Sequence, residues 1–295
     1  MYKLKKNRPV LVRPIYGSIT QGTVFSCARA SRYEACDVNG LTITARCDVA
    51  QQKYPVLNYL PLVKLTDWLR RDGLDMLLEQ ERKAIGGKLK GMLKQAQLSE
   101  SLPMAVSLEQ IAETHFPLNE GKNKQQTANR KFHELVAEIS SFEALSKNEL
   151  DEKFSWFVVN RPKDIENIVR RLSKHDVLGH YFIEKISEDD EEATGYVCLL
   201  REVVTLPRKV AEKLGKGLDH GTYCSVCDGF ETQSGLVIGH DDLAMPVIEI
   251  GSPTIEHILQ SFSQLFGRIG VEDPVDNVIG GIIEHCVSLN KGLKG

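Results

Sequence analysis

Residues 40–65 read GLTITARCDVAQQKYPVLNYLPLVKL, and the fold expected for this chain depends on them. Residues 41–47 and 56–65 are rich in aliphatic, β-branched and aromatic side chains, which favour strands. A polar break between them begins at Cys47-Asp48. Functional groups and turn caps are both common at the end of a strand, so Asp48 is a candidate catalytic residue whose alternative role is to cap a turn.

The dipeptide Asn39-Gly40 precedes the first of these strands, and it is the strongest short-range signal for a hairpin turn. It predicts that residues 34–37 and 41–47 form the two arms of a hairpin. Four or five short strands joined by tight turns are typical of small barrels. We therefore expect a small SH3-like β-barrel over residues 1–66.

The rest of the chain divides into two regions with different predicted secondary structure. Residues 67–174 carry apolar side chains near helical spacing and are expected to be mostly helical. Gly73 is expected to interrupt the first helix, and Gly86-Gly87 marks a kink or a close approach in the second. Residues 175–295 return to strand-like runs followed by helices. The expected fold class is α+β, with an N-terminal barrel, a helical middle and C-terminal strands plus helices.

The composition is that of a soluble globular protein of 295 residues, with 42% hydrophobic and 26% charged side chains. The number of cysteines is odd, seven, which fits free thiols in a reducing cytosol better than a secreted disulfide framework. We find no apolar run near the roughly 18–20 residues of a membrane span, and no signal-peptide pattern at the N-terminus. We therefore expect a cytoplasmic protein without a membrane partner.

Charge is unevenly distributed along the chain. Residues 1–94 contain 17 basic and 8 acidic side chains, a local charge of +9, whereas the remainder has 20 basic and 32 acidic side chains, a charge of −12. This asymmetry predicts that the basic part binds a polyanion such as nucleic acid, or an acidic partner protein; an uneven, solvated surface is the alternative. The most basic helix supplies the candidate nucleic-acid-binding residues Arg82, Lys83, Lys88, Lys90 and Lys94.

Cys224 and Cys227 form a CxxC motif with a histidine on each side, His220 four residues before it and His240 thirteen residues after it. Thiolates and imidazoles are the usual ligands of tetrahedral zinc, so these four residues are the candidate metal ligands. The same pattern also describes two unligated thiols in a tight turn. Apart from this zinc site, the sequence predicts no cofactor.

Polar residues near predicted strand ends supply the candidates for catalysis. A metal-free ribonuclease needs a base that takes the 2′-hydroxyl proton and a cation that holds the phosphate. His180 and Arg201 meet these needs if their two strands pair; the alternative is a surface histidine and a salt-bridged arginine. Motifs of P-loop ATPases, dinucleotide-binding folds, HExxH metalloproteases, GxSxG hydrolases and kinases are absent from the sequence.

Three short segments carry a resemblance to a known family: GTVFSC at 22–27, ITARCDVAQ at 43–51 and YLPLVKL at 59–65. With them, residues 17–66 resemble the small β-barrels of MazF/PemK-type endoribonuclease toxins, and also uncharacterised bacterial proteins of the defence-associated kind. The chain departs from the toxin pattern at residues 21–23, where Gln-Gly-Thr stands in place of Gly-Asp, and it lacks the Arg-Pro before the next strand. The resemblance therefore implies a barrel and transfers no catalytic residue.

These observations favour a bacterial, cytoplasmic accessory or effector protein of a defence or toxin-type system, which acts by binding nucleic acid or a partner protein. One alternative is a toxin-like endoribonuclease that uses the barrel. Another is a zinc-stabilised scaffold subunit. The sequence leaves open whether the protein is an enzyme, because it contains no complete catalytic motif.

Overall fold

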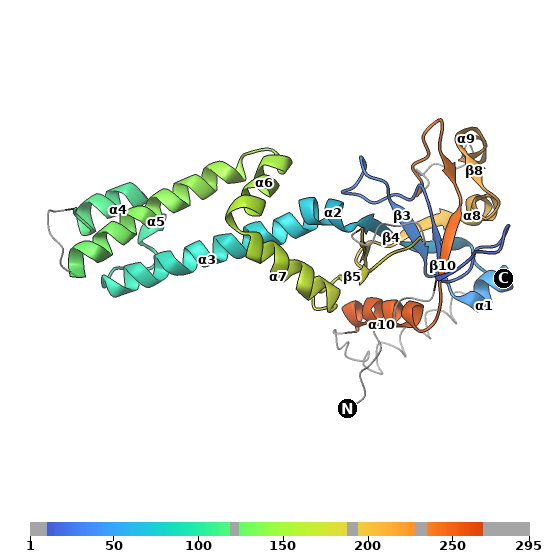
Figure 1. Ribbon diagram of the computed structural model, residues 1–295, viewed down its shortest axis with the longest axis horizontal. Coiled ribbons are helices and arrows are strands. Elements are labelled where there is room, and N and C mark those ends of the chain that lie inside the picture. The colour runs from blue at the N-terminus through green and yellow to red at the C-terminus, as the bar shows by residue number, and fades with distance from the viewer. Residues whose placement is uncertain (1–10, 119–123, 188–193, 228–234, 268–295) are drawn as a thin grey trace, which may run out of the picture.

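The computed structural model describes residues 11–118, 124–187, 194–227 and 235–267. They form a curled antiparallel sheet, a half-barrel, from which a long helical arm projects (Figure 1). We call the sheet and the helices packed directly on it the body. The predicted α+β class is confirmed, whereas the finer prediction of an SH3-like barrel is not. None of the helices in the described ranges is long and apolar enough to cross a membrane.

Short strands toward both ends of the described chain flank a long helical run in its middle. The strands are β1 (Leu11–Val12), β2 (Thr23–Phe25), β3 (Asn39–Thr42), β4 (Val56–Lys64), β5 (His180–Ile183), β6 (Tyr196–Leu199), β7 (Val204–Pro207), β8 (Leu218–Asp219), β9 (Leu243–Ala244) and β10 (Pro246–Ile250). The helices are α1 (Arg46–Ala50), α2 (Leu65–Trp68), the π-helical turn η1 (Leu69–Gly73), α3 (Leu74–Gln95), the 3-10 turn η2 (Leu102–Met104), α4 (Leu108–His115), α5 (Lys124–Ser146), α6 (Leu150–Asn160), α7 (Pro162–Ser173), α8 (Arg208–Leu214), α9 (His220–Cys227) and α10 (Thr254–Phe266).

The long strand β4 is the centre of the sheet. It pairs with β3 along one edge, and along the other it pairs with β7 through its first half and with β6 through its second half. The strand order is β1-β10-β2-β3-β4-β6-β5, so strands from both ends of the described chain share one sheet. Leu57, Leu60 and Leu62 of β4 are fully buried because both faces of the sheet are covered. The strand predicted at residues 56–65 is therefore present and organises the body.

The predicted hairpin at Asn39-Gly40 is wrong. Both residues lie inside β3, opposite Leu62 and Pro61 of β4. Gly40 is needed there because the buried ring of Phe25 on β2 crosses it: a Cβ at this position would lie 2.3 Å from Phe25 Cζ. Close packing against an aromatic ring, rather than a turn, therefore accounts for this glycine.

The prediction that Asp48 lies at the end of a strand is wrong. Strand β3 ends at Thr42, and residues 46–50 form the short helix α1, where Asp48 is exposed in the first turn. The strand-like run over residues 195–206 is also interrupted, because residues 200–203 separate β6 from β7. This interruption allows both strands to pair with β4.

The helical arm consists of α3, α4 and α5, and α6 and α7 lead the chain back to the body (Figure 1). Helices α2, η1 and α3 follow one another directly, so the break predicted at Gly73 is a single π-helical turn rather than a helix end. The tip of the arm has its own core, in which the rings of Phe116 and Phe132 stack with centroids 3.8 Å apart. Nearer the body, the buried Glu81 of α3 accepts a hydrogen bond from Arg161 Nη2 (2.7 Å), at the corner between α6 and α7.

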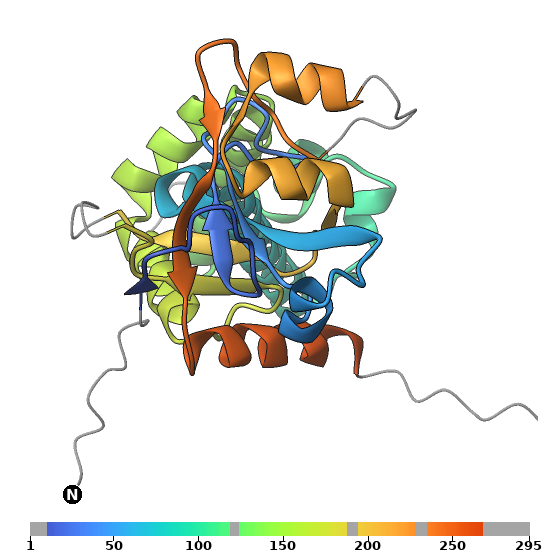
Figure 2. The ribbon, with the colours of Figure 1, turned by 90° about the vertical axis from the view of Figure 1, so that its right-hand side faces the viewer.

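Different helices cover the two faces of the sheet. Helices α2, α3, α7 and α8 contribute to the larger core on one face. Helix α10 lies against the other face, where Ile255 and Ile258 join the buried cluster that includes Leu41 (Figure 2). The last predicted helix, at residues 274–289, lies outside the described residues.

Candidate functional site at the junction of sheet and arm

A polar cavity lies where the helical arm joins the sheet. Its volume is ≈ 360 Å³, and its walls come from the loop after β2, from η1 and α3, from the start of β5 and from the end of β6. Segments far apart in the sequence therefore meet here. The polar residues that line the cavity are Arg32, Tyr33, Asp72, His180, Arg201 and Glu202.

Asp72 connects three of these residues. It lies in the π-helical turn η1, and such turns are frequent at functional sites. Its Oδ2 atom accepts a hydrogen bond from the Tyr33 hydroxyl (2.5 Å), and its Oδ1 atom accepts one from Arg32 Nη1 (2.5 Å). Arg32 also donates to Asp75 Oδ2 (2.6 Å), so two carboxylates hold its guanidinium. Burial and the contact with Asp72 raise the pKa of Tyr33, so the phenol keeps its proton at neutral pH.

His180 stands at the start of β5 with only 13% of its side chain exposed. Its Nε2 atom lies 4.0 Å from Asp72 Oδ2, and its ring packs edge-to-face against that of Trp68, with centroids 5.3 Å apart. Burial lowers the pKa of His180, and the nearby Asp72 carboxylate opposes this shift only in part. The imidazole is therefore neutral near pH 7, and a carboxylate is close enough to stabilise its protonated form.

Trp68 is fully buried and does not line the cavity, and its Nε1 atom has no hydrogen-bond partner among the described residues. The His180 ring also interacts with the Leu178 backbone, and this hydrogen bond opposes the lowering of the histidine pKa.

Arg201 reaches the cavity from the chain just beyond β6. Strands β5 and β6 pair antiparallel, with His180 opposite Leu199. The strand pairing on which the catalytic hypothesis depended is therefore present. Gly179, at φ +86°, lets the arginine side chain cross the backbone, because a Cβ here would lie 2.6 Å from Arg201 Nε. Among the described residues Arg201 has no hydrogen-bonded or ion-paired partner, so its guanidinium is available to bind an anion.

Glu202 completes the polar lining of the cavity. Its Oε1 atom accepts hydrogen bonds from the backbone amide (2.7 Å) and the hydroxyl (2.8 Å) of Ser31, which ties the loop after β2 to the end of β6. The cavity thus combines a neutral imidazole, an unpaired guanidinium, a phenol and two carboxylates. This set can accept a proton, hold a phosphate and stabilise the imidazolium that forms.

The structure brings two of the three candidate catalytic residues together and leaves the third apart. His180 and Arg201 line the same cavity, whereas Asp48 belongs to α1, at the other side of the body in Figure 1. Sequence reasoning missed Asp72 and Tyr33. The interruption of the helical pattern next to Gly73 was the available signal for Asp72, whereas nothing local distinguishes Tyr33 from other loop residues.

The candidate nucleic-acid-binding residues lie on α3, away from the cavity. Arg82 and Lys83 both bind Glu79 on the same helix, at 3.4 and 3.3 Å, and Lys88 binds Glu138 on α5 at 2.8 Å. The other two candidates are exposed lysines without an ion pair in the described part of the chain. Nucleic-acid binding by these five residues stays a prediction.

The CxxC motif lies on helix α9, not on a tight turn as expected. His220 Nδ1 donates to the Ile238 carbonyl (2.7 Å), which leaves its Nε2 facing Cys224 Sγ at 3.6 Å, and the His240 ring lies with its centroid 4.3 Å from that of His220. Cys227 instead packs against the hydrophobic core. Within the described ranges no three metal-ligating side chains lie close enough to hold an ion, so a zinc site stays a prediction.

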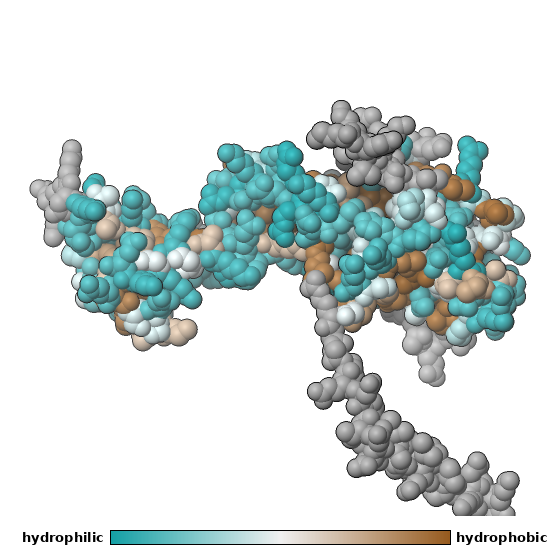
Figure 3. All heavy atoms as spheres, turned by 90° about the horizontal axis from the view of Figure 1, so that it is seen from below, coloured by the Kyte–Doolittle hydropathy of each residue, from teal (hydrophilic) through white to brown (hydrophobic). Residues whose placement is uncertain are grey.

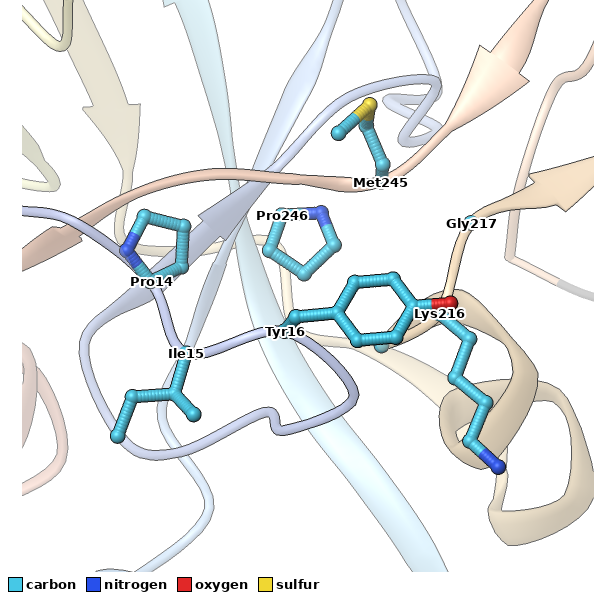
Figure 4. Close-up of a pocket in the computed structure, with 8 residues that line it drawn as sticks. Pro14, Ile15, Tyr16, Lys216, Gly217, Met245 and Pro246 are labelled. Atoms are coloured by element: carbon cyan, nitrogen blue, oxygen red, sulfur yellow. The ribbon is translucent and has the colours of Figure 1, made fainter.

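A second, smaller hollow of ≈ 220 Å³ lies between the chain after β1 and the start of β10 (Figure 4). Its lining is mainly apolar and includes Ile15, Met245 and Pro246. The ring of Tyr16 extends across it toward Lys216 (Figure 4). Tyr16 and Lys216 are the ionisable residues in its lining, which contains no imidazole and no carboxylate, so the polar cavity with its histidine and aspartate is the better candidate for a catalytic site.

Comparison with protein-family models, with curated proteins and with solved structures gives no match for this chain. The case for a function therefore depends on the geometry of the cavity and on the sequence.

Two histidines with a lowered pKa predict how stability depends on pH. Burial lowers the pKa of His180 and of His175, in the latter case with help from His257, so the unfolded chain takes up protons before the folded one does. We expect the free energy of unfolding to fall as the pH drops below about 6.5, the ordinary histidine pKa. Urea unfolding at a series of pH values checks this, and the double variant His175→Gln, His180→Gln should show a weaker dependence. An equal dependence in the double variant would contradict it.

Proposed function

We propose that this protein is an effector of a bacterial defence or toxin-type system that cleaves RNA at the polar cavity without a metal ion. The observation that carries the proposal is the meeting of His180 and Arg201 in one cavity, with Asp72 beside the imidazole. A neutral base and an unpaired cation at one place are the two groups that metal-free cleavage of RNA requires.

The cavity supplies residues that bind the phosphate, take the 2′-hydroxyl proton and stabilise the resulting imidazolium. Arg201 binds the phosphate, and neutral His180 takes the proton of the 2′-hydroxyl. The 2′-oxygen forms a bond to phosphorus while the bond from phosphorus to the 5′-oxygen breaks, and the leaving oxygen takes a proton from water at the open side of the cavity. The products are a 2′,3′-cyclic phosphate and a 5′-hydroxyl. Asp72, 4.0 Å from His180 Nε2, stabilises the imidazolium that forms.

The defence or toxin setting has a separate basis, the resemblance of residues 17–66 to MazF/PemK-type toxins. The catalytic proposal does not depend on that resemblance, because its residues lie at 72, 180 and 201. The two parts of the proposal can therefore fail independently.

Incubation of the purified protein with end-labelled single-stranded RNA in EDTA tests the activity. We expect fragments that end in a 2′,3′-cyclic phosphate, and we expect no cleavage of an oligonucleotide with the same bases and deoxyribose sugars. RNA that stays intact over a range of sequences and pH values would end the proposal. Cleavage that EDTA abolishes would assign the reaction to a metal-dependent mechanism instead.

Binding without chemistry is the second candidate function, and the projecting helical arm favours it (Figure 1). The arm's α3 carries exposed lysines that have no ion pair among the described residues. A gel-shift assay with RNA and DNA at increasing salt tests the nucleic-acid form of this proposal, since phosphate contacts weaken steeply as salt rises. Absence of any shift at low salt would remove it.

A further inference from the structure

The polar groups that the fold leaves unused decide what the polar cavity can bind. Asp72 is already engaged, because its two oxygens accept hydrogen bonds from Arg32 and Tyr33. Besides the imidazole described above, the lining offers a ligand the guanidinium of Arg201 and the carboxylate of Glu202. The first is a cation without a partner in the described chain, and the second is an acceptor.

The carboxylate of Glu202 is held in place and only half used. Its Oε1 atom accepts the two hydrogen bonds from Ser31, which fix the plane of the carboxylate. Its Oε2 atom makes no hydrogen bond or ion pair with the described residues. Because a carboxylate oxygen only accepts hydrogen bonds, the part of a ligand that meets Oε2 must carry N–H or O–H donors.

Arg201 and Glu202 are neighbours in the chain, but their side chains reach different walls of the cavity. The Arg201 side chain crosses Gly179, just before β5, whereas Glu202 reaches Ser31 in the loop after β2. A fitting ligand therefore carries an anion at one end and hydrogen-bond donors at the other. The cavity volume of ≈ 360 Å³ is near the lower end of the range of about 300–1,000 Å³ for ligand pockets, which suits one nucleotide rather than a base pair.

Among the four bases of RNA, guanine matches this acceptor best. Its Watson–Crick edge carries two adjacent donors, the N1–H and the 2-amino group. Adenine and cytosine place a ring-nitrogen acceptor beside their amino group, and uracil has a carbonyl oxygen on each side of its N3–H, so a carboxylate repels part of each of these edges. In a duplex the edge of guanine is occupied by its partner base, so the base that meets Glu202 must be unpaired.

We propose that the polar cavity selects an unpaired guanosine of single-stranded RNA, with its phosphate on Arg201 and its Watson–Crick edge on Glu202. This inference rests on the proposed ribonuclease activity and adds the substrate class to it. The apolar side chains of Met76, Leu178 and Leu199 also line the cavity and provide contacts for the base ring. The rest of the strand stays outside in water, beside an arm that Figure 3 shows largely covered with hydrophilic side chains.

Calorimetric titration of the full-length protein with guanosine, inosine and adenosine 3′-monophosphates tests the proposal. Inosine differs from guanosine only by the absence of the 2-amino group. None of the three can be cleaved, so binding is measured whether or not the protein cuts RNA. The variants are Glu202→Gln, which keeps the shape of the side chain and an oxygen for Ser31, and the control Glu212→Gln. Glu212 pairs with Arg208 on α8 (2.7 Å) and does not line the cavity.

We expect the wild type to bind the guanosine nucleotide about tenfold or more tightly than the adenosine nucleotide, with the inosine nucleotide between them. Glu202→Gln should lose this preference and Glu212→Gln should keep it. Equal binding of the three nucleotides, a preference that survives in Glu202→Gln, or no binding of any would overturn the proposal. Tighter binding of GTP than of guanosine 3′-monophosphate would overturn the assignment to RNA and indicate a free nucleotide instead.

The RNA cleavage assay separates this inference from the proposed function. Fragments whose 3′ ends carry all four bases equally would refute the selection of guanosine and leave the ribonuclease proposal standing. Intact RNA together with guanosine-selective nucleotide binding would refute the ribonuclease proposal and support the binding of guanosine at this cavity.

Discussion

Replacing His180 by asparagine is expected to slow RNA cleavage by roughly 10²–10⁴-fold, the usual contribution of a positioned general base. Asparagine retains a polar side chain of similar shape but cannot take the 2′-hydroxyl proton. Because burial lowers the pKa of His180, the wild-type rate should rise as the pH approaches the ordinary histidine range from below and then level off. Single-turnover rates measured from pH 5 to 8 report both effects (about the span in which histidine titrates).

The control for this variant is His175→Asn. His175 also has a lowered pKa, but it is an exposed residue that stacks on Tyr181 (centroids 4.0 Å apart) and does not line the cavity. We expect His175→Asn to change stability and to leave the rate per folded molecule unaltered. If both variants lose activity equally, or if His180→Asn keeps the wild-type rate, His180 is not the base.

Arg201 provides a second measurement of the same mechanism. Arg201→Gln should weaken RNA binding and slow cleavage, because the variant lacks the cation that holds the phosphate. The guanidinium has no partner among the described residues, so the substitution breaks no ion pair there. Lysine at this position should restore activity only in part, since it offers one charge without the two parallel donors of a guanidinium.

The elements whose pattern is local could be predicted from the sequence. The apolar run at 56–65 forms β4. Serine is a favoured helix N-cap, and the Ser107 side chain caps α4 by accepting from the Gln110 amide (3.3 Å). The order of the strands could not be predicted in this way. Strand β4 pairs with β6 and β7, more than a hundred residues away, and no local pattern contains that information.

The failed hairpin shows how tertiary packing overrides a turn signal. Asn-Gly is favoured in tight turns because both residues tolerate positive φ. Here the glycine is selected by the ring of Phe25, which fills the space of its missing side chain from the neighbouring strand. A single sequence cannot distinguish these two reasons for a glycine.

The candidate site could be predicted only in part from the sequence. His180 lies on a strand that the sequence indicated, Arg201 follows the strand that pairs with it, and their meeting required only that these two strands pair. Asp72 reaches them because the chain makes a π-helical turn at that residue, which places the carboxylate toward Tyr33 and Arg32. Gly73 marks an interruption of the helical pattern in the sequence, but it does not show that the chain makes a π-helical turn there or where the turn directs Asp72.

Replacing Gly22 by alanine is expected to destabilise the protein by about 3 kcal/mol, from left-handed backbone strain and overpacking together. Gly22 has φ +95°, and a Cβ there would lie 2.5 Å from the Ile250 carbonyl oxygen. That oxygen belongs to the backbone and cannot turn aside, because the Ile250 amide is hydrogen-bonded to the Gly22 carbonyl (2.8 Å). The substitution therefore forces β10 away from β2, at the point where the C-terminal strand joins the sheet.

Two further glycines separate the causes of this effect. Gly17 has φ +77° but its Cβ would find its nearest atom at 3.9 Å, so Gly17→Ala carries the backbone strain alone and should cost about 1 kcal/mol. Gly91 lies in α3 with open space around it, so Gly91→Ala should stabilise the protein by about 0.5–1 kcal/mol. Urea unfolding followed by circular dichroism gives all three values. If Gly22→Ala costs no more than Gly17→Ala, the contact between residue 22 and Ile250 is looser than described, and β10 is not anchored to the sheet at this point.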